Sequence, residues 1–385
     1  MGIVTSFMRA FQTDRLDPYP THVIKRIERP TVRIKEEEIE KVDGRNSGFN
    51  RAARGKFGPF LQKERPRIVT KHPLGAALTQ MQVYLKDMVE ETTAPTTAPI
   101  PDDPALITRH IKKTAYFLRA DLVGVCELPP YAVLSHNLNN GDPVECNHKY
   151  AIAILVDQDW NTSEASFGND WISGPMSFIG YTNSGFISRI LADYIRKLGY
   201  PAKAQHAFSY EVVVPPVLVW AGLGEMSRIG DIVVNPFIGP RFKAAVVTTD
   251  LPLVPDKPID FGLQDFCSKC KKCARECPSG AISFGDKVSY NGYERWPLDI
   301  KKCASMRIGN KYGASCGVCM TVCPWNKPFT PFHRLVEWTM RNIPAARRFA
   351  IWGDDLMGYG KPKLENKWWL DLEDVDGTLR IPNQS

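Results

Sequence analysis

The chain has 385 residues, of which 43% are hydrophobic and 24% are charged, an ordinary globular composition that can bury a sizeable core. A length of 385 residues exceeds that of a single small electron carrier and suits two or three domains. The formal net charge of +7 is modest for this length and does not by itself indicate a nucleic-acid partner. The sequence contains no run of about eighteen apolar residues, so it predicts no transmembrane helix.

Residues 1–103 form the first predicted unit, an N-terminal arm and helix followed by a linker. The arm is basic and irregular as far as about residue 72. Apolar residues at helical spacing predict a helix from Gly75 to Val89. Residues 91–103 are rich in Thr and Pro, which favours an exposed linker.

Residues 104–260 form the second predicted unit, in which helices and strands alternate. The predicted elements are a helix at 105–118, strands at 120–126 and 150–156, a helix at 184–198 and a strand at 244–249. This order predicts an α/β layer of about 150 residues. Cys126 ends an apolar strand and is expected to be a buried thiol.

Residues 261–330 contain eight of the ten cysteines, in two runs. The first run has the spacing C-x2-C-x2-C-x3-C-P that is typical of bacterial ferredoxins. The second run repeats it with twelve residues, instead of two, between its first and second cysteines. A fourth cysteine that lies too far along to close its own cube ligates the other cluster. The pattern predicts two 4Fe-4S clusters, one held by Cys267, Cys270, Cys273 and Cys323 and the other by Cys277, Cys303, Cys316 and Cys319.

Two other uses of these cysteines fit less well. A disulfide framework is typical of short secreted domains, and this chain is long. Zinc sites use C-x2-C pairs and do not explain the C-x3-C-P endings. After the cysteines, residues 331–385 are unusually aromatic and are expected to cover the body of the protein as a C-terminal wrap.

The stretch Gly222-Leu-Gly224 is similar to a glycine-rich phosphate loop. It does not follow a clean strand, and no convincing acidic residue comes about twenty positions later. A tight turn packed against a neighbouring backbone or ligand is therefore the favoured interpretation.

An ordered set of motifs over residues 75–375 resembles the corrinoid-dependent reductive dehalogenases, specifically the catalytic subunit of the respiratory type. The motifs are ADLVGVC at 120–126, ADYIRKLGYPA at 192–202, GLGEMSRIG at 222–230, GPR at 239–241, TDLPL at 249–253 and GYGKPKLENKWW at 358–369. The resemblance implies an α+β or α/β fold with a nitroreductase-like cobalamin-binding domain beside a ferredoxin-like domain. It also implies a base-off cobalamin next to the two clusters.

The resemblance implies roles for several residues near that cofactor. Tyr181 would be the proton donor, just before the predicted helix, and Arg241 would be its basic partner, with Lys243 as the alternative. A cation close to a phenol lowers its pKa and stabilises the phenolate, and an arginine does so without losing its own charge. The implied corrinoid contacts are Ser177, His206 (or the neighbouring Gln205), Gly222, Gly224 and Lys243.

The inserted segment 304–315 contains Met306, Arg307 and Tyr312. We expect it to face the corrinoid or the substrate rather than to act as a spacer.

The function implied is reductive removal of a halogen from a small organohalide. Two alternatives stay open, an epoxyqueuosine reductase acting on tRNA and an electron-transfer iron–sulfur protein without corrinoid. The resemblance further implies an unknown electron donor, a small membrane anchor protein giving peripheral membrane association, and no nucleic-acid partner. It implies a mature exported protein at the outer face of the cytoplasmic membrane whose leader is absent from this chain; a cytoplasmic location is the alternative.

Overall fold

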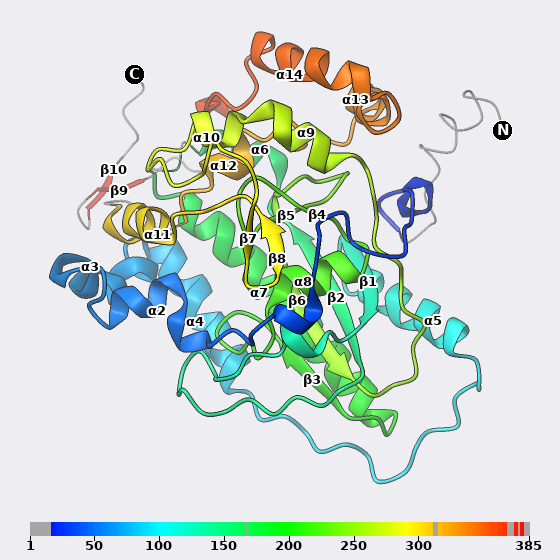
Figure 1. The fold of residues 1–385 in the computed structure, drawn as a ribbon. Helices are drawn as coiled ribbons and strands as arrows, with labels where there is room; N and C mark the ends of the chain where they lie inside the picture. Colours follow the sequence, from blue (N-terminus) through cyan, green and yellow to red (C-terminus); the bar gives the residue numbers. More distant parts are fainter. Residues whose placement is uncertain are drawn as a thin grey trace.

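The structure is a computed structural model that describes residues 17–166, 168, 170–310, 315–367, 373–375 and 378–380. Its centre is a four-stranded sheet in the order β1-β2-β6-β3 (Figure 1). The strands are β1 (Leu122–Glu127), β2 (Tyr150–Asp157), β6 (Phe242–Thr249) and β3 (Ala202–Gln205). All three strand pairings are antiparallel, so the fold is α+β rather than a parallel α/β layer.

Shorter elements surround this sheet. Two-stranded ribbons pair β4 (Glu225–Met226) with β5 (Val233–Val234), β7 (Val288–Tyr290) with β8 (Tyr293–Arg295) and β9 (Glu373–Val375) with β10 (Thr378–Arg380). The helices are α2 (Gly48–Ala53), α3 (Pro59–Glu64), α4 (Pro73–Asp87), α5 (Pro104–Phe117), α6 (Trp160–Ala165), α7 (Ser173–Lys197), α8 (Val214–Trp220), α9 (Leu263–Cys270), α10 (Lys272–Arg275), α11 (Ile300–Gly309), α12 (Val318–Thr321), α13 (Pro331–Asn342) and α14 (Arg347–Leu356). Short 3₁₀ turns occupy Thr21–Val23, Glu36–Glu38, Gly44–Asn46, Arg65–Val69, Pro130–Ala132, Pro344–Ala346 and Leu364–Lys367.

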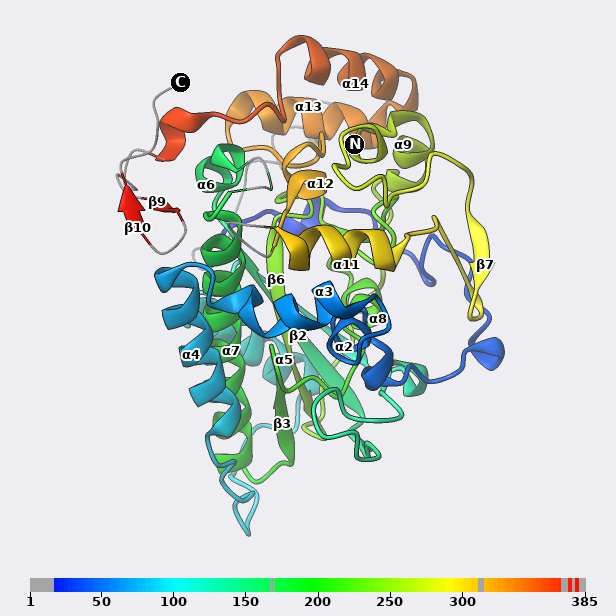
Figure 2. The same ribbon diagram turned by 90° about the vertical axis from the view of Figure 1, so that its left-hand side faces the viewer.

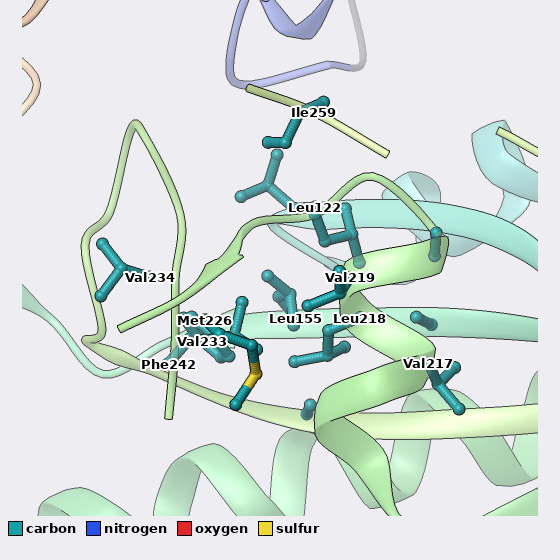
Figure 3. Close-up of a cluster of buried hydrophobic side chains, with 14 of the residues drawn as sticks. Leu122, Leu155, Val217, Leu218, Val219, Met226, Val233, Val234, Phe242 and Ile259 are labelled. Carbon is teal, nitrogen blue, oxygen red and sulfur yellow. The ribbon is translucent and has the colours of Figure 1, made fainter. Parts of the chain in front are cut away.

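The sheet is buried on both faces, which explains the nearly continuous apolar runs in β2 and β6. On one face, Ile187, Leu191 and Ile195 of α7 pack against the sheet, together with α5. On the other face, α8 packs against β1 and β2; Figure 3 shows Leu218 and Val219 beside Leu122 and Leu155. That second core continues without a break through Phe266 and Trp325, so the cysteine-bearing segment shares the core of the sheet.

Helix α7 begins eleven residues before the predicted helix at 184–198 and places Tyr181 within the helix rather than ahead of it. Its N-terminal half contains Gly174, Pro175, Gly180 and Gly185, which read as helix breakers in the sequence. A proline in the first turn costs little because the first four amides lack partners within the helix. Gly180 is explained by packing, since a Cβ there would lie 3.0 Å from Cγ of Lys243.

Most of the other predicted elements have counterparts. The helices predicted at 75–89 and 105–118 correspond to α4 and α5, and the strands at 120–126, 150–156 and 244–249 correspond to β1, β2 and β6. Cys126 is a buried thiol, as predicted. Strand β3 and helix α8 were not predicted, because β3 has four residues and α8 opens on Val-Pro-Pro.

The outer layers contain the N-terminal arm and the aromatic tail. The N-terminal arm folds back so that α2 and α3 pack against α11 (Figure 2). The aromatic tail forms α13 and α14, which lie over α9, while Trp368 and Trp369 lie outside the described residues. Within the described part of the chain, no helix combines the length and apolarity needed to span a membrane.

Candidate active site and cluster ligands

The first predicted cysteine set surrounds one small cavity. Cys267, Cys270, Cys273 and Cys323 all line it. Burial raises the pKa of Cys267, and the charges of Cys323 and Cys270 raise it further. The three sulfurs therefore lie within electrostatic reach of one another. Trp325 lines the same cavity, and its buried Nε1–H has no hydrogen-bond partner in the described structure. An apolar cage with four thiols and an unused donor fits an iron–sulfur cluster, whose sulfur atoms accept hydrogen bonds.

The second predicted set is brought together by α11 and α12. Cys303 lies in α11, Cys319 in α12, and Cys316 just before α12. Burial raises the pKa of Cys316, and the nearby Cys303 and Cys277 raise it further. Cys277 thus lies near the sulfurs of the second run although it ends the first run. This proximity agrees with the assignment from the spacing, in which the last cysteine of each run ligates the other cluster.

Among the described residues, no three His, Cys, Asp or Glu side chains converge closely enough to hold a single metal ion. A mononuclear zinc site draws its sulfurs to about 2.3 Å from one centre. The left-handed backbone at Lys271, Cys316 and Gly317 turns the chain sharply between ligands, which is how closely spaced cysteines can point toward a common centre.

Tyr181 and Lys243 face each other between α7 and β6. The Lys243 Nζ lies 5.1 Å from the centre of the Tyr181 ring. Both side chains are half-buried. Burial raises the pKa of the Tyr181 phenol and lowers the pKa of Lys243 to about 7. The pair therefore combines a protonated phenol with an amine that titrates near neutrality.

Arg307 is the second cationic group at this place. Its charge lowers the pKa of Tyr181, against the effect of burial. Burial lowers the pKa of Lys243 most, and the charge of Arg307 lowers it further. Its guanidinium lies over the ring of Phe49 at 4.6 Å, which fixes it by a cation–π contact. It also lowers the pKa of Cys303, within the same helix, and of Cys316. Arg307 thus lies within electrostatic reach of both the second cysteine set and the Tyr181–Lys243 pair.

Arg241 lies elsewhere. It is 3% exposed, and its Nε and Nη2 donate to the two carboxylate oxygens of Asp157 at 2.6 and 2.8 Å. Its Nη1 donates to Oδ1 of Asn326, three residues after Cys323. These bonds commit the guanidinium to joining the end of β2 to the cluster segment. Lys243, the alternative named from the sequence, is the residue that lies beside Tyr181.

The remaining predicted contacts do not form one group. Ser177 is buried in α7, and His206 lines a polar cavity near β3 with its Nδ1 on the carbonyl of Ala207. Burial lowers the pKa of His206 to about 4. Gly222 has φ of +66°, and a Cβ there would meet Arg26 and the carbonyl of Lys257. Gly224 is equally close to the carbonyl of Val234, so both glycines act as tight turns packed on neighbouring backbone.

A large cavity lies between the N-terminal arm, α8 and the β7–β8 ribbon. Its volume is about 490 Å³. Its walls are mostly apolar, and polar groups such as Arg51 and Asn291 stand among them. Gly48 and Ile300 line it where α2 meets the start of α11, two helical turns before Arg307. Apolar walls with scattered polar groups suit a broad, flat macrocycle with amide side chains.

The comparisons with known proteins agree with these features. Residues 266–327 match the family model of a 4Fe-4S dicluster domain. A tetrachloroethene reductive dehalogenase of Sulfurospirillum multivorans is 31% identical over 77% of this chain and 64% of its own length. The structure of the catabolic reductive dehalogenase NpRdhA with 3-bromo-4-hydroxybenzoic acid superposes with a TM-score of 0.90, at 42% identity, over 96% of this chain. The chain is thus similar to reductive dehalogenases in both sequence and fold.

This chain is shorter than the relatives to which it is similar. A second tetrachloroethene reductive dehalogenase, from Desulfitobacterium hafniense strain Y51, is 36% identical over 56% of this chain and 39% of its own length. The chain spans 54% of NpRdhA. It therefore corresponds to a part of these relatives, the part that contains the sheet and the two cysteine sets.

Sequence reasoning named Arg307 only as a member of the inserted segment and gave it no role. A helical reading of 300–309 places Cys303 and Arg307 four residues apart and therefore on one helix face. That spacing was the available signal. Met306 lies in the same helix, and Tyr312 lies outside the described residues.

Proposed function

We propose that the chain carries out reductive dehalogenation, with Tyr181 as the proton donor. The observation that supports this most is the placement of the half-buried Tyr181 phenol, two cations and a cluster ligand set within electrostatic reach of one another. The nearby charge of Cys319 raises the pKa of Lys243, while Arg307 and burial lower it. An acid next to an electron source is what reductive cleavage of a carbon–halogen bond requires.

The overall reaction consumes two electrons and one proton, and it replaces the halogen on carbon by hydrogen while halide leaves. Electrons enter singly through the Cys267 set and pass to the Cys303 set. The Tyr181 hydroxyl gives its proton to the carbon that has lost its halide. Lys243 in its ammonium form and Arg307 stabilise the phenolate that remains, and solvent then returns the proton.

We propose the 490 Å³ cavity as the chamber of a base-off corrinoid. Tyr131 and Trp220 would contact the macrocycle, and Arg51 and Asn291 would bind its amide side chains. When bound, the corrinoid supplies the reducing centre that breaks the carbon–halogen bond. This assignment moves the expected contacts away from His206, Gly222 and Gly224.

The substrate we propose is a halogenated aromatic compound that bears an anionic group. Two cations beside Tyr181 suit a carboxylate or a phenolate, and Arg307 can bind either through two parallel hydrogen bonds. The bound 3-bromo-4-hydroxybenzoic acid of NpRdhA has this chemistry.

The membrane anchor, the exported location and the absence of a nucleic-acid partner stay proposals that follow from the family. No contact in the described structure bears on them.

Anaerobic reconstitution with cobalamin tests the function. The loaded protein, given reduced methyl viologen, should release bromide from 3-bromo-4-hydroxybenzoic acid and release chloride from tetrachloroethene far more slowly. Absence of halide from both, together with reduction of epoxyqueuosine in tRNA, would replace this proposal by the tRNA enzyme. A protein that binds iron and sulfide but no cobalt would favour an electron-transfer role.

A further inference from the structure

The outer surface of α13 and α14 is rich in exposed apolar side chains. We call this surface the α13–α14 face, formed by Phe332, Leu335, Phe349, Trp352, Leu356 and Met357, each between 45% and 74% exposed. Both helices lie at one end of the molecule, away from α4 and β3 (Figure 2). Between them runs a groove of about 200 Å³ lined by Phe332, Phe349 and Met357. Isolated exposed apolar residues are common, but six on one helical hairpin mark an interaction surface.

The floor of this groove is also the wall of the first cluster cage. Pro324 and Trp325 line both the groove and the cavity that holds Cys267, Cys270, Cys273 and Cys323. Helix α14 packs on α9, which contains two of these cysteines. A molecule seated in the groove is therefore separated from the first cysteine set by one layer of side chains.

A buried ionic network fixes the hairpin to the cage. The Lys272 Nζ donates to the carboxylate of Asp354 and, at 2.9 Å, to the carbonyl of Tyr359. Lys327 Nζ lies 2.7 Å from the other oxygen of Asp354. Lys272 lies between Cys270 and Cys273, so the position of α14 is tied directly to the ligand loop. A rigid approach surface keeps the distance between donor and acceptor constant.

Basic residues are concentrated in this part of the chain. Residues 263–276 and 331–363 together contain ten Lys and Arg against five Asp and Glu, a net charge of +5 out of +7 for the whole chain. Arg348, Lys269 and Lys361 are exposed at this end of the molecule. An apolar centre with a basic surround is complementary to a partner with an apolar patch ringed by acidic residues.

We propose that the α13–α14 face is the docking site of a small acidic one-electron carrier protein, which reduces the first cluster through Pro324 and Trp325. Trp352 and Phe349 provide the apolar contact, and the basic residues orient the carrier before contact. Electron-transfer complexes bury little surface and dissociate readily, which a short helical hairpin and a shallow groove can support. The inference depends on the first cluster and is independent of the halogenated substrate.

The test follows bleaching of cluster absorbance in stopped flow, with the cluster-loaded full chain and no organohalide. The probe is an acidic bacterial flavodoxin in its two-electron-reduced form, which loses one electron as the cluster gains one. We expect Trp352→Ser to slow this reduction by about tenfold or more. Arg348→Glu should slow it several-fold at low salt, and the difference should vanish as ionic strength rises. Tyr84→Ser, an equally exposed aromatic on α4, is the matched control and should change nothing.

Dithionite serves as the reference reductant because it is small and needs no docking surface. All variants should be reduced by dithionite at the wild-type rate, which shows that the clusters are intact. The proposal is overturned if flavodoxin does not reduce the wild type faster than it reduces Trp352→Ser. It is also overturned if Trp352→Ser instead converts a dimer to a monomer, or abolishes binding to anionic lipid vesicles, with flavodoxin kinetics unchanged. The readout is cluster reduction, so failure of dehalogenation would not affect it.

Discussion

Lys243 Nζ lies 5.1 Å from the centre of the Tyr181 ring, whereas Arg241, two positions earlier in the chain, makes a bidentate salt bridge with Asp157. The two cations therefore have separate surroundings. Lys243 projects from β6 toward α7, and Arg241, just before the strand, is directed to the end of β2 and the cluster segment. This geometry favours a catalytic role for the lysine and a structural role for the arginine, and the predictions below separate them.

Tyr181→Phe should retain both clusters and the corrinoid and lose turnover by about 10²–10⁴-fold, the usual contribution of a positioned acid. The ring is preserved, so packing against Lys243 is kept. Cluster absorbance, cobalt content and halide release measure the three properties. Tyr210→Phe removes a neighbouring hydroxyl that donates to the carbonyl of Ala244 and serves as the comparison. Normal halide release by Tyr181→Phe would assign the proton to another donor.

The activity should depend on pH through Lys243. Its pKa of about 7 means that it is an ammonium group below pH 7 and neutral above it. Phenolate stabilisation requires the charged form, so turnover should decline as pH rises through about 7. In Lys243→Arg the charge persists, because a guanidinium stays protonated in proteins, and the decline should move to higher pH. A pH profile that is the same in wild type and Lys243→Arg would exclude this lysine as the titrating group.

Arg241→Ala should destabilise the fold by about 3–5 kcal/mol, because it leaves the Asp157 carboxylate without its buried partner. Thermal unfolding of the cluster-loaded protein measures this change. Arg275→Ala removes a surface pair with Asp355 and should cost at most about 1 kcal/mol. Equal stability of the two variants would contradict the structural role of Arg241. The pH dependence should be unchanged in Arg241→Ala protein that remains folded.

Arg307→Gln should discriminate between substrates. Loss of a charge-assisted hydrogen bond raises KM by about tenfold or more for a substrate with a carboxylate or phenolate. KM for a neutral chlorinated alkene should change little, whereas turnover of both substrates should fall because Arg307 also stabilises the Tyr181 phenolate. Steady-state kinetics with 3-bromo-4-hydroxybenzoic acid and tetrachloroethene provide the comparison. If KM rises equally for both, Arg307 acts on the shape of the site and not on substrate charge.

Cys270→Ala should lose one cluster, visible as a fall of about half in iron and acid-labile sulfide. Cys270 lines the cage of the first set, and a cubane needs four ligands. Cys146→Ala removes a cysteine outside both sets and should leave iron content unchanged. Loss of iron in both variants would contradict the ligand assignment.

The cysteine spacing predicted both ligand sets because cluster geometry is local and leaves a strict pattern in the chain. The resemblance to the family was read from short motifs between residues 120 and 369, which are local in the same way. Tyr181 was named, but its helix was cut short, because Gly180 reads as a breaker when the approach of Lys243 is unknown. The choice between Arg241 and Lys243 depended on contacts 84 and 62 residues away in sequence, with Asp157 and Tyr181. Contacts between residues so far apart in the chain produce no periodic pattern in the sequence.

The bridge from Arg241 to Asp157 and Asn326 limits how the protein can be recombined. Asn326 also donates to the carbonyl of Thr321, and Phe266 and Trp325 belong to the core that includes β1 and β2. Residues 261–330 are therefore not a transplantable cassette, although their cysteine pattern looks self-contained. A chimera that exchanges this segment between relatives must carry along the partners of Arg241 and Trp325. Without them the hybrid would have a poorly packed core where the segment meets the sheet, and its clusters would lose their fixed position relative to the sheet.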